Sequence, residues 1–245
     1  MQRILGLMRK AIQQYDMIAD GDRICVGVSG GKDSLVLLSG LVRLRKFIGI
    51  DFHVVGLTID PNFGGVPGDY SSVAEYCAGE GIEYHILPTQ IGEIVFDVRK
   101  EPNPCSLCAR MRRGALHDEA VRLGCNKIAL GHNYDDAVET FIMNLFTEGR
   151  IGCFSPKNLL DGKELTIIRP LVLADEREIR RAANRTGLQI VKSKCPADGH
   201  TNRQRAKEFL AEMERKDHGF KDRIFGAMRR GNVDGWGFPE KLKSK

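Results

Sequence analysis

The chain has 245 residues, a length that predicts one or two domains and allows a sizeable core. Hydrophobic residues make up 42% and charged residues 28%, which excludes a mostly disordered chain, a collagen-like repeat and a small disulfide-rich scaffold. No run approaches the roughly 18 apolar residues of a membrane span, and the first ten residues lack the features of a secretory signal. We therefore expect a cytoplasmic protein without membrane contact. In that setting the seven cysteines should bind metal, react or be buried rather than form disulfides.

The net charge is +5, and its position is more informative than its size. Residues 201–245 contain 12 Lys and Arg against 7 Asp and Glu, so the first 200 residues are neutral overall. A basic C-terminal tail is one sign of nucleic-acid binding, although a solvated helix with a few extra lysines explains it equally well.

Helix and strand patterns alternate along the chain. In chain order they predict a helix at 3–19, a strand at 23–29, a helix at 34–47, a strand at 51–59, a helix at 70–79, a strand at 83–87, helices at 92–99 and 106–123, a strand at 127–130, a helix at 135–146, a strand at 165–168, a helix at 175–186, an edge strand at 188–191, and helices at 202–216 and 219–230. This alternation implies an α/β fold, with a doubly wound, mainly parallel five-stranded sheet and helices on both faces. We expect a single domain over 1–245. It would comprise an N-terminal helix at 1–20, a core at 21–192, and a basic helical tail at 193–245 that carries a cysteine.

The strongest motif lies between the first predicted strand and the next helix, where the chain reads Ser29-Gly30-Gly31-Lys32-Asp33-Ser34. Glycines let the backbone turn tightly and bring its amides close to a ligand. A helix N-terminus adds free N–H groups and the positive end of the helix dipole, so the loop predicts an anion site suited to phosphate. It differs from the Walker loop, because Lys32 is followed by Asp33 rather than by Ser or Thr. A plain glycine turn with a capping Asp or Ser is the structural alternative.

A second polar turn follows the fourth predicted strand and reads Gly131-His132-Asn133-Tyr134-Asp135-Asp136. Ligands of open α/β sheets bind at the carboxyl ends of strands, so we expect this turn to face the same crevice as the glycine loop. Asp135 and Asp136 are hard oxygen ligands of the kind that Mg²⁺ on ATP takes, and Glu139 follows one turn along the helix. Alternatively, the acid pair only caps the helix. His132 could act as a base, although a lone histidine is more often structural.

Cys105 and Cys108 open a predicted helix after a proline pair, a position that favours thiolates. The pair fits a dithiol redox site, part of a structural zinc site, or an iron–sulfur cluster completed by a distant thiolate. The sequence has no second Cys-x-x-Cys pair for zinc, and Cys195 is the natural third thiol. The other four are predicted to be structural, one of them also a candidate fourth ligand: Cys25, Cys77, Cys125 and Cys153.

The glycine loop and the Gly-His-Asn turn resemble the two nucleotide motifs of the PP-loop ATP pyrophosphatases. Together with the cysteines, they resemble the cluster-dependent tRNA thiolation enzymes, above all the tRNA 2-thiocytidine family. The similarity is best over about residues 20–150, and beyond them it rests on the stretch 168–171 and on Cys195. It implies an adenine nucleotide alpha-hydrolase-like, HUP-type Rossmann-like fold that binds ATP and Mg²⁺.

The resemblance also implies roles for individual residues. The loop would grip the pyrophosphate of ATP through Ser29, Gly30, Gly31, Lys32, Asp33 and Ser34. Gly131 would contact ATP, Asp136 would be the Mg²⁺-linked catalytic acid, and Thr58 and Ile59 would meet adenine through backbone atoms. Arg112, one turn after Cys108, would neutralise charge in the transition state. Three thiolates would hold a [4Fe-4S] cluster with one open iron: Cys105, Cys108 and Cys195.

The implied activity is that of an ATP-dependent tRNA sulfurtransferase. The C2 oxygen of a pyrimidine in an unstacked tRNA loop would attack the α-phosphate, and sulfur on the open iron would then displace AMP. The implied partners are tRNA, held by the tail and Arg113, ATP, a cysteine desulfurase or free sulfide as sulfur donor, and a second copy of the chain.

Four alternatives remain open at this point. Thiolation could give 2-thiouridine instead of 2-thiocytidine. The zinc-binding cysteine pairs of the 2-thiouridine branch are missing, but the 2-thiocytidine branch often reads His-His where this chain has His132-Asn133. The sulfur could travel on a cysteine persulfide. The chain could instead be a cluster-independent, lysidine-synthetase-like ligase, or a non-catalytic nucleotide- and RNA-binding metal protein.

Overall fold

The structure is a computed structural model that describes residues 1–100, 104–160, 162, 164–186, 189–191, 195–196 and 202–237. The predicted tail at 193–245 therefore lies partly outside the described residues. Within these ranges, no helix has the length and the apolar content that a membrane crossing requires.

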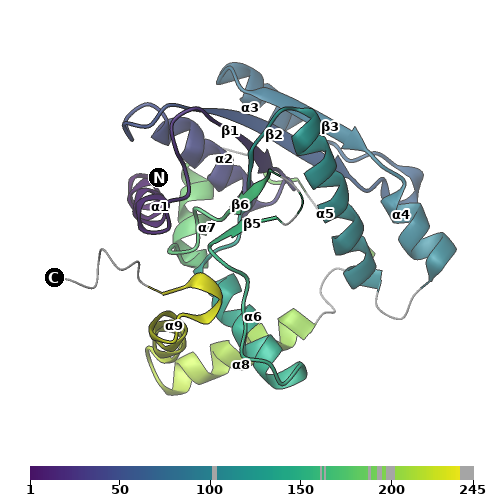
Figure 1. The fold of residues 1–245 in the computed structure, drawn as a ribbon. Coiled ribbons are helices and arrows are strands. Elements are labelled where there is room, and N and C mark those ends of the chain that lie inside the picture. Colours follow the sequence, from purple (N-terminus) through teal and green to yellow (C-terminus); the bar gives the residue numbers. More distant parts are fainter. Residues whose placement is uncertain are drawn as a thin grey trace.

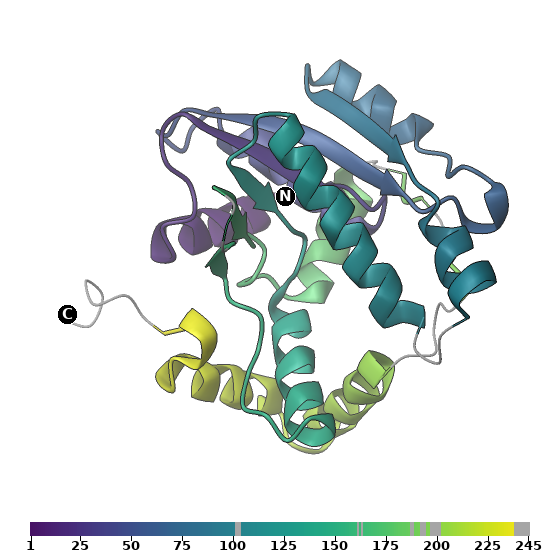
Figure 2. The same ribbon diagram turned by 45° about the vertical axis from the view of Figure 1, so that its right-hand side comes forward.

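A six-stranded sheet runs through the molecule, with helices on both of its faces (Figures 1 and 2). The strands lie in the order β3-β2-β1-β4-β6-β5, and all neighbours are parallel except β5 and β6, which are antiparallel. The sheet is thus doubly wound and mainly parallel, as the sequence predicts. The strand bounds are Asp22–Gly27 (β1), Phe52–Asp60 (β2), Glu83–Pro88 (β3), Lys127–Ala129 (β4), Lys157–Leu159 (β5) and Thr166–Ile168 (β6).

Two of the sequence predictions for the sheet are wrong. The sheet has six strands rather than five, because β5 is too short and too exposed to show the apolar pattern of a strand. Residues 189–191 of the predicted edge strand are not in a strand, and residue 188 lies outside the described part of the chain. Instead, the backbone N–H of Val191 donates to the carbonyl oxygen of Gly30 over 3.0 Å, so this segment lies on the loop after β1.

The helices follow the predicted order. Their bounds are Gln2–Gln14 (α1), Lys32–Leu44 (α2), Ser71–Gly79 (α3), Ile91–Glu93 (α4), Pro104–Arg122 (α5), Tyr134–Thr147 (α6), Glu176–Thr186 (α7), Asn202–Lys216 (α8) and Phe220–Arg230 (α9), with shorter turns at Phe63–Gly65 (η1), Ile94–Arg99 (η2, a π-helix) and Val233–Gly235 (η3). The first helix ends before the predicted residue 19, because Asp16 has a positive φ of 47° that breaks the helical path.

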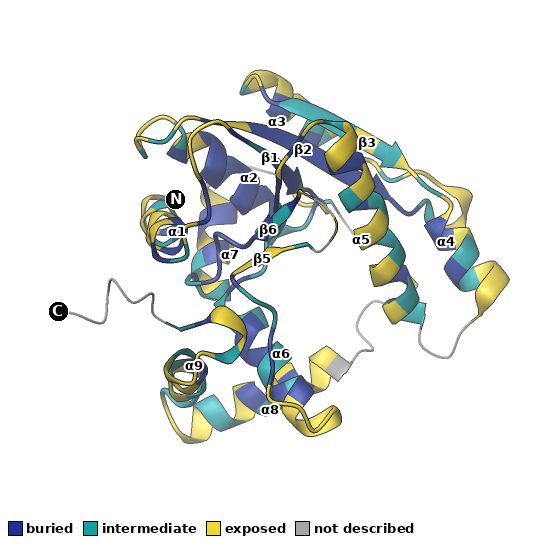
Figure 3. Cartoon of the chain, viewed as in Figure 1, coloured by how far each residue is buried: buried dark blue, intermediate teal, exposed yellow. Residues whose placement is uncertain are grey.

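Each face of the sheet has its own apolar core, because successive side chains of a strand point to opposite faces. On β1, Ile24 and Val26 belong to the core shared with α1, α2 and α7, whereas Cys25 belongs to the core shared with α4 and α5. The strands in the middle of the sheet are accordingly buried, while the outer faces of the covering helices are exposed (Figure 3).

The tail helices α8 and α9 lie against α6, well away from β3 at the other end of the sheet (Figure 1). Trp236, which is fully buried, holds the end of this unit. Its Nε1 donates to the carbonyl oxygen of Phe154 over 2.7 Å, and its ring packs edge-on against Tyr15 and Phe225. The described part of the tail over 202–237 is therefore packed against the folded core.

Candidate active site

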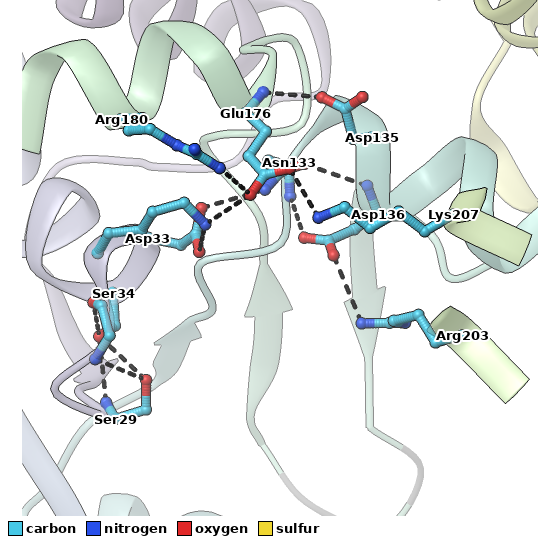
Figure 4. Close-up of polar contacts among 12 residues, drawn as sticks. Ser29, Asp33, Ser34, Asn133, Asp135, Asp136, Glu176, Arg180, Arg203 and Lys207 are labelled. Atoms are coloured by element: carbon cyan, nitrogen blue, oxygen red, sulfur yellow. Dashed lines mark hydrogen bonds and ion pairs between the residues drawn. The ribbon is translucent and has the colours of Figure 1, made fainter. Parts of the chain in front are cut away.

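The two predicted motifs meet at the carboxyl edge of neighbouring parallel strands, β1 and β4. The side-chain Nδ2 of Asn133 donates to Oδ1 of Asp33 over 3.1 Å, which joins the second turn to the first (Figure 4). A Cβ atom on Gly131 would lie 3.1 Å from the backbone of Asp33 and Ser34. Gly131 therefore allows the two turns to approach each other closely, as the sequence predicts for one shared crevice.

The glycine loop is held in shape by its own hydroxyl groups. Ser34 Oγ donates to the carbonyl oxygen of Gly31 over 2.9 Å and accepts from the backbone N–H of Ser29 over 3.2 Å. Gly30 has a φ of +79°, and a Cβ atom there would lie 2.6 Å from Cβ of Val191. Only glycine fits both conditions. The loop is thus preformed at the N-terminus of α2, where backbone N–H groups can receive an anion.

Lys32 is the cation of this loop, and it takes part in a chain of ion pairs. Its Nζ lies 2.9 Å from Oδ2 of Asp33 and 3.1 Å from Oε1 of Glu176, at the start of α7. The other carboxylate oxygen of Glu176 lies 2.8 Å from Nζ of Lys207, on α8. Burial acts to raise the pKa of Glu176, but the hydrogen bonds from Lys207 and Lys32 outweigh it and lower the pKa to about 2. Glu176 therefore carries a negative charge at neutral pH.

Asp135 and Asp136 have different roles in the structure. Asp135 accepts from the backbone N–H of Glu176 and from Nζ of Lys221, each over 2.7 Å. Asp136 forms a capping box with Asn133 through its Oδ2, so its Oδ1 faces outward at 3.4 Å from Nη1 of Arg203. Burial raises the pKa of Asp136. Asp136 thus keeps one carboxylate oxygen turned outward, and its binding of Mg²⁺ stays a prediction from the sequence.

A cavity of about 240 Å³, here called the acidic cavity, lies between these groups. It is lined by acidic residues from α2, α6 and α7, by basic residues from α2 and α8, and by two amide side chains. The lining residues are Lys32, Asp33, Asn133, Asp135, Asp136, Glu139, Glu176, Arg203, Gln204 and Lys207. Hard carboxylate oxygens beside phosphate-binding amides are the donor set that Mg²⁺ takes together with a nucleotide.

A second cavity, here called the central cavity, has a volume of about 430 Å³ and opens on the other side of Asp33. Both turns line it, together with Ile59 at the end of β2, and Arg112 and Arg113 on α5. Thr58 is fully buried, and its Oγ1 donates to the carbonyl oxygen of Val28 over 2.8 Å, so its side chain is engaged within the sheet. Of the two residues predicted to meet adenine, Ile59 thus lines the cavity, and Thr58 could contribute only its backbone.

His132 also lines the central cavity, and its protonation is fixed by Arg169. Arg169 Nε donates to Nδ1 of His132 over 3.2 Å, so the ring proton of His132 is placed on Nε2. Burial, aided by the charge of Arg169, lowers the pKa of His132 to about 3. A ring with Nδ1 engaged and Nε2 protonated has no free lone pair. His132 therefore acts as a hydrogen-bond donor and not as a base.

Cys108 interacts electrostatically with Arg112 and with the two other predicted cysteine ligands, Cys195 and Cys105. Cys105 and Cys108 lie in the first turn of α5, and Cys195 comes from the segment after α7. Burial raises the pKa of Cys108, Arg112 opposes this, and the nearby Cys195 and Cys105 raise it further. This raised pKa runs against the expectation that the helix N-terminus favours a Cys108 thiolate. Among the described residues, no three His, Cys, Asp or Glu side chains already form a metal-binding group.

The other cysteines lie in the interior, as predicted. Cys25, Cys77 and Cys125 are buried in the two cores. Cys153 is 9% exposed, and its Sγ donates to the carbonyl oxygen of Ala137, so it is not positioned as a fourth ligand.

Four residues of the site received no role from the sequence. Glu176, Arg203 and Lys207 reach the acidic cavity from α7 and α8, and Arg169 reaches His132 from the residue after β6. Their approach depends on how the tail and α7 pack, which local sequence patterns do not encode. The basic excess of the tail was the one available signal for Arg203 and Lys207.

The comparison with known families first defines the class of protein. The family described as PP-loop domain matches residues 5–213, which is most of the chain. This match confirms the resemblance of the glycine loop and of the Gly-His-Asn turn to the PP-loop enzymes.

Individual relatives narrow the assignment. A tRNA-cytidine(32) 2-sulfurtransferase of Pelobacter propionicus is 43% identical, over 88% of this chain and 80% of the relative. That of Geobacter sulfurreducens is 38% identical, over 95% and 90%. The solved structure of the U34-tRNA thiolase NcsA from Methanococcus maripaludis with its [4Fe-4S] cluster has a TM-score of 0.75 and 26% identity, over 92% of this chain and 77% of NcsA. The chain therefore belongs to the PP-loop family, and within it to the family of the tRNA-cytidine(32) 2-sulfurtransferases.

Proposed function

We propose that this chain is an ATP-dependent tRNA sulfurtransferase that replaces the C2 oxygen of cytidine 32 with sulfur. Family membership supports the substrate. The position of Arg112 is the observation that carries the proposal. Arg112 lines the central cavity together with the glycine loop and also acts electrostatically on the Cys108 thiol. The nucleotide site and the Cys108 thiol thus adjoin at one arginine.

The first step is adenylation of the base. The C2 oxygen of cytidine attacks the α-phosphorus of ATP, the bond to the β-phosphate oxygen breaks, and pyrophosphate leaves with the electron pair. Asp136 would bind the Mg²⁺ that accompanies ATP. Arg112 would offset the negative charge that develops on the α-phosphate, a contribution of the kind that dominates such reactions. His132 would donate its Nε2 proton as a hydrogen bond into the central cavity.

The second step replaces oxygen with sulfur. A sulfur nucleophile bonds to C2, the C2–O bond breaks, and AMP leaves with the oxygen. Three thiols are the donor chemistry of an iron–sulfur cluster, so Cys105, Cys108 and Cys195 fit that group. When bound through three thiolates, a [4Fe-4S] cluster would supply a metal position open to sulfide. The described cysteines form no preassembled metal group, so they would have to move closer to one another when the cluster binds.

The cluster is tested by purifying the chain without oxygen and recording its visible absorbance, iron and sulfide. We expect broad visible absorbance and about four irons per chain. Both should be lost in Cys108→Ala and kept in Cys77→Ala, a matched control whose thiol is buried in the other core. A colourless chain that stays iron-free after anaerobic reconstitution would contradict the proposal of a cluster. It would favour sulfur transfer through a cysteine persulfide, or a lysidine-synthetase-like ligase.

The identity of the sulfur donor, a homodimer and a cytoplasmic location stay predictions from the sequence. Free sulfide is already at the oxidation level that the second step needs, whereas a persulfide from a cysteine desulfurase would first require a two-electron reductant such as a thiol pair.

A further inference from the structure

The tail helix α8 directs two basic side chains into the acidic cavity. Arg203 and Lys207 are four residues apart, so they project from the same side of the helix. Arg203 Nη1 lies 3.4 Å from Oδ1 of Asp136, and Lys207 Nζ lies 2.8 Å from Oε2 of Glu176. Figure 4 shows both reaching from α8 towards the carboxylates around the glycine loop.

The packing of α8 fixes this direction. Ala206 and Leu210 of the same helix are buried, at 8% and 1% exposure, in the core that α1, α2 and α7 share with the sheet. Arg203 Nη2 also bonds to Oγ1 of Thr140 on α6, over 3.2 Å, which ties the guanidinium to the helix that carries Asp136. The side chains of Arg203 and Lys207 are 44% and 45% exposed, but the packing of α8 and these contacts direct their charged ends to the acidic cavity.

The two side chains extend the phosphate-binding set of the glycine loop. Lys207 and Lys32 share one carboxylate, that of Glu176, so a single oxyanionic group already bridges the tail to the loop. Phosphate oxygens are acceptors of the same kind, and arginine binds them with a planar pair of donors. A polyphosphate that starts on the loop amides and runs into the acidic cavity would meet Lys32, then Lys207 and Arg203.

We propose that Arg203 and Lys207 bind the β- and γ-phosphates of ATP and hold them as the pyrophosphate leaving group. This inference rests on the proposed function, because it deepens the same ATP site. It assigns to part of the basic tail a role at the nucleotide, whereas the sequence alone predicts that the tail holds tRNA.

The test measures equilibrium binding of inorganic pyrophosphate with Mg²⁺, and of AMP, by isothermal titration calorimetry. We expect Arg203→Ala and Lys207→Ala each to weaken pyrophosphate binding about tenfold, since each removes a charged hydrogen bond. AMP affinity should stay within about twofold, because AMP lacks the two outer phosphates. Arg205→Ala is the matched control, since this exposed residue is two positions along α8 and so faces the other way. Arg203→Lys and Lys207→Arg keep the charge and should restore part of the affinity.

Unchanged pyrophosphate affinity in both alanine variants would overturn the inference, and so would an equal loss for AMP. Pyrophosphate binding needs neither tRNA nor a cluster, so the two proposals can fail separately. If the wild-type chain thiolates tRNA but the variants bind pyrophosphate normally, only this inference is wrong. If the variants lose pyrophosphate affinity but the wild-type chain thiolates nothing, only the proposed function is wrong.

Discussion

Glu139 illustrates how single residues of the acidic cavity respond to their surroundings. Its side chain is 5% exposed and lies one helical turn after Asp135, in the cavity wall. Burial and the charge of Asp136 raise its pKa to about 7, from 4.5. The folded chain therefore keeps Glu139 protonated in a pH range where the unfolded chain releases the proton.

This difference predicts a pH dependence of stability. A raised pKa in the folded state contributes stability that is fully present below about pH 4.5 and is lost as the pH rises to about 7. Glu139→Gln removes this loss, so the variant should gain up to about 3 kcal/mol relative to the wild type as the pH rises from 4.5 to above 7. Urea unfolding of both chains in EDTA at pH 4.5, 6 and 7.5 measures it. A stability difference that does not change with pH would contradict the prediction.

At the scale of elements, regular patterns identified most of the fold. β1, β2 and β4 are largely buried because both faces of the sheet are covered, and β1 and β2 contain the apolar residues that make them plain in the sequence. The two nucleotide turns are also local signals, each placed between a strand and a helix. The exceptions are segments whose structure depends on distant partners. β5 forms only by pairing with β6, and residues 189–191 lie on the glycine loop through Val191.

The packing of the tail against the rest of the chain is a further feature that local sequence patterns do not predict. Trp236 joins η3 to the loop after α6 and to Tyr15 at the end of α1, and these two hydrogen bonds connect residues more than 80 positions apart. The sequence offers a single tryptophan at this place, with no indication of what it packs against.

Trp236→Ala should destabilise the folded chain by about 3–5 kcal/mol, because it removes a fully buried aromatic side chain. Trp236→Phe keeps most of the packing and loses the hydrogen bond to Phe154, so it should cost markedly less. Denaturant unfolding followed by circular dichroism gives both values. Equal stability of the two variants would show that the ring does not anchor the tail.

At the scale of the whole molecule, the charge of the tail is less available than the sequence count implies. Of the tail's basic residues, several form ion pairs with acidic residues of this chain: Arg203, Lys207, Lys216, Lys221 and Arg223. Two of these pairs lie within the tail itself, and three join it to the core. The tail thus contributes to the site and to the fold, and among its described residues the exposed Arg205, Arg215 and Arg230 remain for a polyanionic partner.

The most direct test of the account is the nucleoside content of tRNA after reaction with the chain. Unmodified tRNA would be incubated anaerobically with the cluster-reconstituted chain, ATP, Mg²⁺ and sulfide, then digested and analysed by mass spectrometry. We predict 2-thiocytidine at position 32, dependent on ATP. Its formation should be slowed about 100-fold in Asp136→Asn, because an amide binds the Mg²⁺ that stabilises the leaving phosphates more weakly than a carboxylate does, and little changed in the surface variant Asp222→Asn. ATP cleavage without 2-thiocytidine, or sulfur on a uridine instead, would contradict the account.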